Sequence, residues 1–305
     1  MAMLAVNRCG ARLYVDAPAK INVGLRVLGR RPDGYHELES LVMAVSLADR
    51  LEVAPAVGDE LSLEVQHEGA EAPADDSNLV LRAARLLRSE SGAVGGARLI
   101  LRKRIPAGRG LGGGSSDAAA ALTLLSHFWQ INYNTHRLAS LGAKMGSDVP
   151  FFLNGPLAII RGRGEVVQPI DHKVNVWIVL LVPPFELATQ RVYNRFTELP
   201  LTTRLADARL ALESLVRGQI GELGKYLVND LEPAAQALNA EMLGLRRLLE
   251  DTGASCVSMT GSGSAVYALA ADERGARELV RALRPGTGTG VYILTPWNDQ
   301  KRCAT

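Results

Sequence analysis

The spacing of hydrophobic residues changes several times along the chain and predicts a mixture of strands and helices. Hydrophobic residues alternate with others over residues 12–29, which places Ile21 and Val23 on one face of a strand. Lys20 and Asn22 fall on the opposite face. We predict further strands at 38–55, 59–69, 96–106, 149–153, 156–170, 174–185, 255–259, 265–270 and 290–297. Helical spacing predicts helices at 78–90, 115–130, 135–146, 189–199, 203–216, 232–253 and 273–284.

The order of these elements indicates the fold class. Strands outnumber helices in the first half of the chain, and the two types are mixed unevenly rather than in regular alternation. Such an order is typical of an α+β fold with two layers in each domain. A polar, glycine-rich stretch at 161–173 suggests a division. We therefore predict one domain over residues 1–165 and a second over 166–305.

Composition and charge narrow the choice of partners. The 305 residues are 47% hydrophobic and 22% charged, with a formal net charge of +2. A charge so near zero argues against nucleic acid or an anionic membrane as the main partner. The N-terminal residues lack the pattern of a signal peptide, and the apolar run at 174–185 is too short to span a bilayer. Cys9, Cys256 and Cys303 are widely spaced, which fits a reducing cytoplasm and offers no metal-binding framework.

Residues 105–122, "IPAGRGLGGGSSDAAAAL", hold five glycines within seven residues just before a predicted helix. Residues without a Cβ atom let the backbone approach a bound group closely, and the free N–H groups and dipole of the following helix favour an anion. A tight turn that serves packing alone would explain one or two glycines but not five followed by "SSD". We predict a phosphate cradle made by Pro106, Ala107, Gly108, Arg109, Gly110, Leu111, Gly112, Gly113, Gly114, Ser115 and Ser116.

The common phosphate-binding motifs do not fit this loop. "GRGLGG" matches the dinucleotide pattern, but the acidic residue expected about 20 residues further on is missing. A Walker loop requires GK[ST] after its glycines, whereas this chain has "GSSD". The HRD and DFG motifs of protein kinases are also absent from the sequence. The loop therefore belongs to another class of phosphate site.

The pattern P-x-x-x-G-L-G-G-G-S-S resembles the phosphate loop of the GHMP kinases, a family named for galactokinase, homoserine kinase, mevalonate kinase and phosphomevalonate kinase. Further blocks with the same resemblance are "APAKINVGLRVLGRRPDGYHELES", "GSDVPFFL", "NDLEP" and "MTGSGSAVYAL". The "GYH" block points to members whose acceptor carries a cytidine diphosphate, because homoserine and mevalonate kinases are not expected to have it. The resemblance implies a ribosomal-protein-S5-like N-terminal domain that binds ATP and a ferredoxin-like C-terminal domain for the substrate.

The implied reaction moves the γ-phosphoryl group of ATP to the 2-hydroxyl of cytidine diphosphate methylerythritol, in the non-mevalonate route to isoprenoids. Asp148 of "GSDVPFF" resembles the catalytic aspartate, which would accept the hydroxyl proton or orient the hydroxyl. Lys20 of "PAKIN" resembles the catalytic lysine, which would keep Asp148 ionised and offset charge on the transferred group. Without the resemblance, Asp148 is equally well a turn or capping residue. The alternative for Lys20 is a surface lysine, but its place in an otherwise apolar strand and on one face with Asn22 argues against that.

Tyr35 and His36 are the residues expected to recognise the base. The resemblance implies that Tyr35 stacks on the cytosine ring and that His36 hydrogen-bonds the edge of the base. Tyr193 is the candidate for the opposite face of the base, with Phe185 and Phe196 as competitors nearby. The alternative for Tyr35 and Tyr193 is ordinary core packing.

Three other polar residues are expected near the acceptor. Asn22 would hydrogen-bond the substrate or steady Lys20. Lys144 and Ser147 precede Asp148 and are predicted to line the same pocket, although a lysine at a helix end often only complements the helix dipole.

A second glycine-rich turn, "MTGSGSAV", matches the third motif of the family. Thr260, Gly261, Ser262 and Gly263 are expected to brace the phosphate loop and the substrate diphosphate, the alternative being a plain hairpin turn. The basic run 102–104, together with Arg109, would either steer ATP or form a solvated strand edge, and we favour the strand edge.

Mg²⁺ is expected to arrive with ATP and to be held chiefly by phosphate oxygens, with Ser115 or Ser116 as candidate protein ligands. The metal ligands are otherwise unassigned. Two alternative functions remain open at this point: a GHMP kinase with a different acceptor, and a catalytically silent member that senses a nucleotide.

Overall fold

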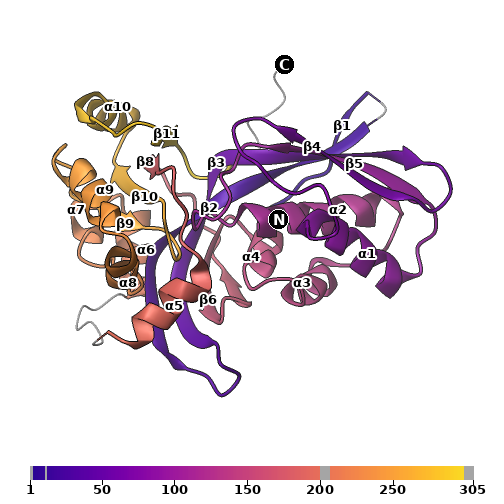
Figure 1. The fold of residues 1–305 in the computed structure, drawn as a ribbon, viewed down its shortest axis with the longest axis horizontal. Helices are drawn as coiled ribbons and strands as arrows, with labels where there is room; N and C mark the ends of the chain where they lie inside the picture. The colour runs from indigo at the N-terminus through magenta and orange to yellow at the C-terminus, as the bar shows by residue number, and fades with distance from the viewer. Residues whose placement is uncertain (1–2, 11, 200–206, 299–305) are drawn as a thin grey trace.

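Two β-sheets organise the chain in the computed structural model, which describes residues 3–10, 12–199 and 207–298 (Figure 1). The first sheet has seven strands, and its main path runs β1-β2-β3-β5-β4. These strands are β1 (Asn7–Cys9), β2 (Arg12–Arg30), β3 (His36–Ala56), β5 (Gly96–Lys103) and β4 (Leu61–His67). β6 (Leu157–Gly162) pairs with the beginning of β3 and with β7 (Val166–Pro169). β3 therefore has β5 beside one half and β6 beside the other.

Four helices cover one face of the first sheet (Figure 1). They are α1 (Leu79–Ser91), α2 (Gly113–Phe128), α3 (Thr135–Ala143) and α4 (Val149–Asn154). α2 packs against β2 and β3, and Ala118–Ala121 are fully buried in it. Because alanine is small and is the best helix former, this run lets α2 lie close to the sheet and to its neighbouring helices.

The second sheet has the strand order β11-β8-β10-β9, with all pairs antiparallel. Its strands are β8 (Trp177–Val182), β9 (Val257–Met259), β10 (Val266–Ala270) and β11 (Gly290–Leu294). The helices of this half are α5 (Thr189–Thr197), α6 (Ala208–Val216), α7 (Ile220–Leu223), α8 (Glu232–Leu238), α9 (Glu241–Glu250) and α10 (Glu273–Ala282). The first strand thus lies between the fourth and the third, the order of a ferredoxin-like sheet. The predicted α+β class is confirmed.

The middle of β2 and β3 is buried on both faces. Val15 and Ala17 belong to a core shared with the four helices, whereas Ile21 and Val23 belong to a core shared with the second sheet. We call this second cluster the shared core. Its members from β2 and β3 include Ile21, Val23 and Met43, and those from the second sheet include Ile178, Leu180 and Tyr267. Polar side chains on this part of β2 are therefore buried and need partners.

Three element predictions were wrong, and the domain boundary is not resolved. The single strand predicted over 156–170 is a hairpin of two strands, β6 and β7. Residues 149–153, predicted as a strand, form the helix α4, in whose first turn Pro150 lies. Proline suits that position because its fixed φ matches a helix and its missing N–H is not needed there. The helix predicted over 232–253 is split into α8 and α9 at Asn239, whose backbone is extended. The predicted division after residue 165 falls inside the β6–β7 hairpin and stays a prediction. Residues 203–206 of the predicted helix at 203–216 lie outside the described chain, as does Cys303.

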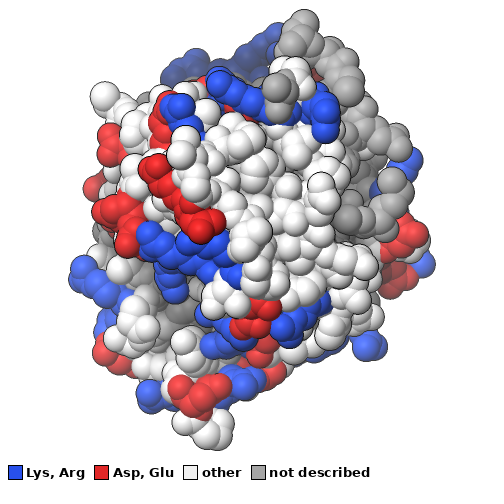
Figure 2. Space-filling view, turned by 90° about the vertical axis from the view of Figure 1, so that its right-hand side faces the viewer, with Lys and Arg blue, Asp and Glu red and all other residues white. Residues whose placement is uncertain are grey.

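The basic run at the end of β5 is interleaved with acidic partners. Arg102 pairs with Glu52 and Glu68, and Arg104 also pairs with Glu68, so both arginines are partly solvated, but β5 lies between β3 and β4 and the favoured interpretation of a strand edge is wrong. Figure 2, which views the β4, β5 and α1 end of the molecule, shows basic and acidic side chains intermixed. Within the described ranges, no helix is long and apolar enough to cross a bilayer.

Candidate active site

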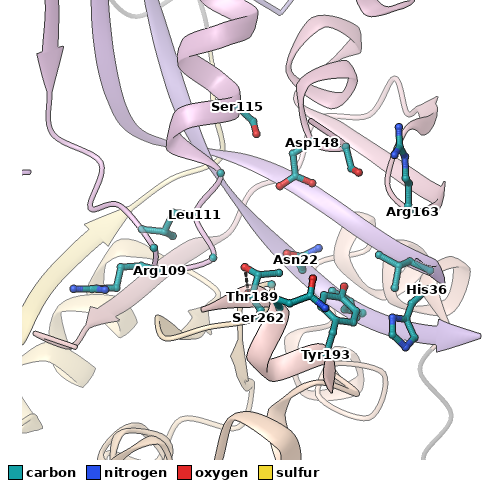
Figure 3. Close-up of a pocket in the computed structure, with 18 of the residues that line it drawn as sticks. Asn22, His36, Arg109, Leu111, Ser115, Asp148, Arg163, Thr189, Tyr193 and Ser262 are labelled. Carbon is teal, nitrogen blue, oxygen red and sulfur yellow. Dashed lines mark hydrogen bonds between the residues drawn. The ribbon is translucent and has the colours of Figure 1, made fainter. Parts of the chain in front are cut away.

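A cleft of about 870 Å³ opens beside the glycine loop, and β2, α5 and the beginning of α4 also line it (Figure 3). It brings together most of the predicted site, although the residues come from both halves of the chain. The predicted residues that line it are Lys20, Asn22, Tyr35, His36, Pro106, Ala107, Gly108, Arg109, Gly110, Leu111, Gly112, Gly113, Gly114, Ser115, Ser147, Asp148, Tyr193, Gly261 and Ser262.

The glycine loop has a backbone conformation that requires glycine. Gly108, Gly110 and Gly112 have φ values of +65°, +75° and +70°, in the left-handed region that other residues rarely adopt. A Cβ atom at Gly110 would also overlap the carbonyl oxygen of Thr260. The loop is held in place because the Lys20 N–H donates to the Leu111 carbonyl at 2.9 Å. The first residues of α2, Gly113–Ser115, also line the cleft beside the loop.

Lys20 is buried at the centre of the cleft wall, with 4% of its surface exposed. Its Nζ donates to Asn22 Oδ1 at 2.5 Å. Burial lowers the pKa of Lys20 from its ordinary value, while the negative charge of Asp148 acts in the opposite direction. The surface-lysine alternative is therefore wrong.

Asn22 has its hydrogen-bonding groups engaged by neighbours. Its side-chain N–H group donates to Ser40 Oγ at 2.9 Å, and its backbone N–H donates to Thr260 Oγ1 at 3.1 Å. The Tyr267 hydroxyl donates to the Asn22 carbonyl at 2.8 Å. Of the two predicted roles of Asn22, the geometry favours steadying Lys20, because the amide oxygen already accepts from the lysine.

Asp148 directly precedes α4, and its carboxylate faces the cleft opposite the Ser115 hydroxyl (Figure 3). Its side chain makes no capping hydrogen bond within the described part of the chain, so the capping alternative is not supported. The carboxylate lies close enough to influence the charge of Lys20. The two predicted catalytic residues, which are 128 positions apart in sequence, therefore face one reaction space.

The far end of the cleft holds His36 and one of the three aromatic candidates, Tyr193. The His36 ring stacks on Tyr193, with ring centroids 5.0 Å apart and planes at 25°. Phe196 meets His36 edge-on and is buried in the core, and Phe185 also packs against that core. Of the three aromatic candidates, Tyr193 is the one that lines the cleft.

His36 and Tyr35 present different surfaces to a ligand. His36 Nε2 is buried and has no hydrogen-bond partner among the described residues. Burial and the nearby Arg30 lower the pKa of His36, which keeps the ring neutral at neutral pH. The Tyr35 side chain is 51% exposed, and the Arg163 guanidinium lies 5.0 Å from the centre of its ring.

The second glycine-rich turn sits between the loop and β2. Gly261 and Ser262 line the cleft, whereas Thr260 and Gly263 are outside the described lining. Thr260 Oγ1 donates to the Gly110 carbonyl at 3.2 Å, which agrees with a bracing role. Ser262 Oγ and Thr189 Oγ1 are 2.9 Å apart, so they form a hydrogen bond across the cleft wall.

Two residues predicted to belong to the site, Lys144 and Ser116, do not line the cleft. Lys144 is absent from the described lining of the cleft, and its Nζ pairs with Glu90 at 2.7 Å on the surface. Ser116 is fully buried in α2 and is also absent from that lining, because the first turn of the helix points it inward. Its hydroxyl has no hydrogen-bond partner among the described residues.

Lys103, the middle residue of the basic run, points inward rather than to solvent. Its Nζ contacts Asp49 at 2.5 Å and Asp117 at 2.8 Å, and all three side chains are buried. Asp49 also accepts the backbone N–H groups of Arg104 and Ile105. We call Lys103, Asp49 and Asp117 the buried triad. It joins β3, β5 and α2 directly behind the phosphate loop.

Thr189 and Arg163 also line the cleft, although the sequence analysis did not select them. The helical spacing of Thr189, Tyr193 and Thr197 places one polar face of α5 toward the cleft, and this spacing was visible in the sequence. Arg163 lies in the β6–β7 turn, and no local pattern singled it out.

Comparison with known proteins supports the family resemblance. Residues 78–156 match the model of the GHMP kinase N-terminal domain, and residues 211–296 match that of the C-terminal domain. The chain is 41% identical over 268 residues to the 4-diphosphocytidyl-2-C-methyl-D-erythritol kinase of Pelotomaculum thermopropionicum, covering 88% of this chain and 92% of the relative. It belongs to the GHMP kinase family.

Other relatives of this GHMP kinase agree. The enzyme of the same name from Carboxydothermus hydrogenoformans is 38% identical, covering 95% of this chain and 99% of the relative. A crystal structure of 4-(cytidine 5'-diphospho)-2C-methyl-D-erythritol kinase superimposes with a TM-score of 0.74 at 36% identity, covering 93% and 100% of the two chains. A homoserine kinase from Cytophaga hutchinsonii reaches a TM-score of 0.73 at 19% identity, covering 95% and 96%, which shows the shared fold alone.

Proposed function

We propose that this GHMP kinase transfers the γ-phosphoryl group of ATP to the 2-hydroxyl of 4-diphosphocytidyl-2-C-methyl-D-erythritol, a step of the non-mevalonate isoprenoid route. The observation that carries the proposal is the cleft itself. One continuous cavity holds a preformed phosphate cradle, the facing pair Lys20 and Asp148, and the His36 and Tyr35 end. Relatives with this named activity, 35–41% identical over most of the chain, support the same acceptor.

The donor site follows from the loop. The phosphates of ATP would lie against the backbone N–H groups of the glycine loop, where the dipole of α2 adds attraction. Ser115 is placed to donate a hydroxyl hydrogen to a phosphate oxygen at the same point. Because the loop needs no rearrangement to form the cradle, the donor would be positioned at little entropic cost.

The transfer needs positioning and charge stabilisation more than covalent help from the protein. The acceptor hydroxyl oxygen forms a bond to the γ-phosphorus while the bond from that phosphorus to the bridging oxygen breaks, and ADP leaves with the electron pair. Asp148 accepts the hydroxyl proton or orients the hydroxyl. Lys20 lies beside it as an ammonium and offsets the negative charge that spreads over the phosphoryl oxygens.

Mg²⁺ fits the donor side of the cleft. The Ser115 hydroxyl and the Asp148 carboxylate face one another beside the loop, and both are the hard oxygen ligands that Mg²⁺ prefers. An ion carried by ATP needs only one or two protein oxygens, and no group of three acidic, His or Cys side chains stands together in the described chain. When bound, Mg²⁺ neutralises phosphate charge.

The acceptor end would recognise the cytosine. The exposed Tyr35 ring offers a stacking surface, and the unpartnered His36 Nε2 offers a hydrogen bond to the edge of the base. Tyr193 supports the His36 ring from behind through stacking. We infer a cytoplasmic enzyme that acts on a small molecule rather than on nucleic acid, in line with the free thiols of Cys9 and Cys256 and the near-zero net charge.

The test is an ADP-release assay with ATP, Mg²⁺ and one of four acceptors: 4-diphosphocytidyl-2-C-methyl-D-erythritol, mevalonate, homoserine or galactose. We expect turnover of the cytidyl acceptor alone. Asp148→Asn keeps the shape of the side chain but not its charge, and should lower kcat by about 10²–10⁴-fold. Turnover of another acceptor would disprove the assignment of the acceptor, and ATP binding without any turnover would favour a sensor.

Replacement of Tyr35 tests the base-binding end separately. Tyr35→Ala should raise the KM for the cytidyl acceptor by the equivalent of about 1–3 kcal/mol of stacking energy, with the KM for ATP unchanged. Tyr35→Phe keeps the aromatic face and serves as the control, with near-normal KM. An equal effect of both substitutions would show that the hydroxyl rather than the ring face matters.

A further inference from the structure

Residues 229–233 form the "NDLEP" block. Its first residue, Asn229, lies between α7 and α8 and is 3% exposed. The backbone here runs beside β2, since the Leu25 N–H donates to the Val228 carbonyl at 2.7 Å and the Asp230 N–H donates to the Leu25 carbonyl at 2.9 Å. Asn229 is thus anchored on the strand that carries Lys20.

The side chain of Asn229 holds the second glycine-rich turn. Asn229 Nδ2 donates one hydrogen bond to the Met259 carbonyl and one to the Gly261 carbonyl, both at 2.8 Å. Its Oδ1 accepts from the Leu231 backbone N–H at 3.0 Å. Both amide hydrogens are therefore used on the turn, and the amide oxygen fixes the orientation of the side chain.

The Thr260–Gly261 turn, which Asn229 holds, contacts both Lys20 and the phosphate loop. A Cβ atom built on Gly261 would lie 3.2 Å from Lys20 Nζ and 3.2 Å from the Gly110 carbonyl oxygen, so the Gly261 backbone is in close contact with both. Thr260, the preceding residue, hydrogen-bonds the Gly110 carbonyl and the Asn22 N–H. A shift of this turn would move the groups that position Lys20 and the loop.

We propose that Asn229 is a positioning residue for phosphoryl transfer, because its amide fixes the Thr260–Gly261 turn against Lys20 and the phosphate loop. The proposal rests on the roles proposed above for Lys20 and the loop. Asn229 acts through the turn and does not line the described cleft itself. The donor end should therefore depend on it, while the distant Tyr35 and His36 end should not.

The chemistry of the site explains why an asparagine stands here. Two buried carbonyl oxygens face one nitrogen, and a primary amide is a side-chain group that gives two N–H donors in a plane. An aspartate of the same shape has no hydrogen to donate when ionised, so it would repel both carbonyls and leave them unsatisfied. A glutamine keeps both donors but displaces them by one methylene.

The experiment compares Asn229→Asp, Asn229→Ala and Asn229→Gln with the wild type. For each folded variant we would measure kcat, the KM for ATP and the KM for the cytidyl acceptor. The Asp and Ala variants should lose on the order of 10–100-fold in kcat, the size expected for a small misplacement of catalytic groups. The KM for ATP should rise by more than the KM for the acceptor, because the base-recognition end of the cleft is distant from the turn. The Gln variant should fall between them and the wild type.

Two controls separate positioning from stability. Asn239→Asp is the same substitution at a helix terminus, where the side-chain oxygen accepts from the Glu241 N–H, and it should leave the kinetic constants unchanged. Thermal unfolding of every variant gives the folded fraction. Hydrogen exchange over residues 257–266 should be faster in Asn229→Asp than in the wild type, because the turn has lost its anchor.

Three outcomes would overturn the proposal. These are unchanged kinetic constants per folded molecule, equal changes in both KM values, and failure of all three variants to fold, which would assign Asn229 to the fold alone. If the wild type itself does not use the cytidyl acceptor, the proposed function fails separately. In that case ATP affinity, measured by calorimetry without any acceptor, still decides the role of Asn229: weaker binding in the Asp variant supports it and equal binding refutes it.

Discussion

The pKa of Lys20 depends on where the fold places its side chain. An ammonium group buried beside the cleft loses much of its hydration, which makes the charged form less favourable. The attraction of Asp148 works against this effect but does not outweigh it, so the pKa of Lys20 lies below the ordinary value of 10.5. The buried lysine therefore gives up its proton more readily than a solvated lysine does.

The pH dependence of the rate should report this lowered pKa. Lys20 supports catalysis when it is charged, which is the case below its pKa, so kcat should fall as the pH rises through that value. The alkaline limb should begin below the ordinary lysine value of 10.5. Lys20→Arg keeps a positive charge throughout this range, so the limb should disappear even if the overall rate is lower. Steady-state kinetics from neutral to alkaline pH measure both profiles, and an unchanged limb in the variant would assign it to another group.

Residues of the site differ in how well the sequence revealed them. Lys20, Asp148 and the glycine loop stand in short contiguous motifs, and the structure places all of them at one cleft. Lys144 was placed wrongly because proximity in sequence to Asp148 says nothing about direction, and its side chain points to Glu90. Contacts such as that of Asn229 with Gly261 join residues 32 positions apart, so no local pattern could show them.

At the scale of elements, the junction of β5, the glycine loop and α2 depends on glycine conformation. Gly110→Ala should destabilise the protein by at least about 1–2 kcal/mol, because alanine is strained at a φ of +75° and its Cβ would overlap Thr260. Gly114→Ala is the matched control in the first turn of α2, where a Cβ meets Leu79 Cδ1 at an ordinary 3.5 Å. Thermal unfolding compares the two. Equal losses would show that the loop tolerates a side chain at Gly110.

The buried triad stabilises the same junction of β5, the glycine loop and α2 through ion pairs. Lys103→Met should lower the free energy of unfolding by about 3–5 kcal/mol at neutral pH, because Asp49 and Asp117 are left without their cation. Burial already raises the pKa of Asp117, and removal of the lysine should raise it further. A carboxyl group with a raised folded-state pKa binds protons more readily when folded, so the deficit should shrink as the pH falls through that pKa. Urea unfolding at several pH values measures this, and a deficit independent of pH would contradict it.

Element prediction failed where the local pattern was ambiguous or the decisive partner was remote. The four apolar residues in 149–153 fit a strand or a buried helix equally well, and Pro150 was the local signal for a helix start. The sequence did predict a strand through residues 102–104, but only the folded chain shows that Lys103 points inward to Asp49 and Asp117. Periodicity thus identifies faces, whereas the partners of a face depend on the tertiary fold.

At the scale of the whole molecule, the two sheets share one of the hydrophobic cores. The middle of β2 and β3 belongs to the first sheet, yet its Ile21, Val23 and Met43 side chains pack with Ile178 and other residues of the second sheet. The cleft is built at this junction, so its geometry depends on both halves staying together. The predicted boundary after residue 165 stays a prediction, and the shared core draws residues from both sides of it.

This shared core predicts that the protein unfolds in one cooperative transition. Variants that keep a single tryptophan, Trp129 in the first half or Trp177 in the second, should give coincident urea transitions by fluorescence. Tyr267→Phe removes the hydrogen bond from the second sheet to the Asn22 carbonyl, which should cost about 1 kcal/mol because that buried carbonyl loses a donor. Since the core is common, the substitution should shift both transitions equally. If the Trp177 transition alone moved, the two halves would be unfolding independently and the cleft would be a contact between separate domains.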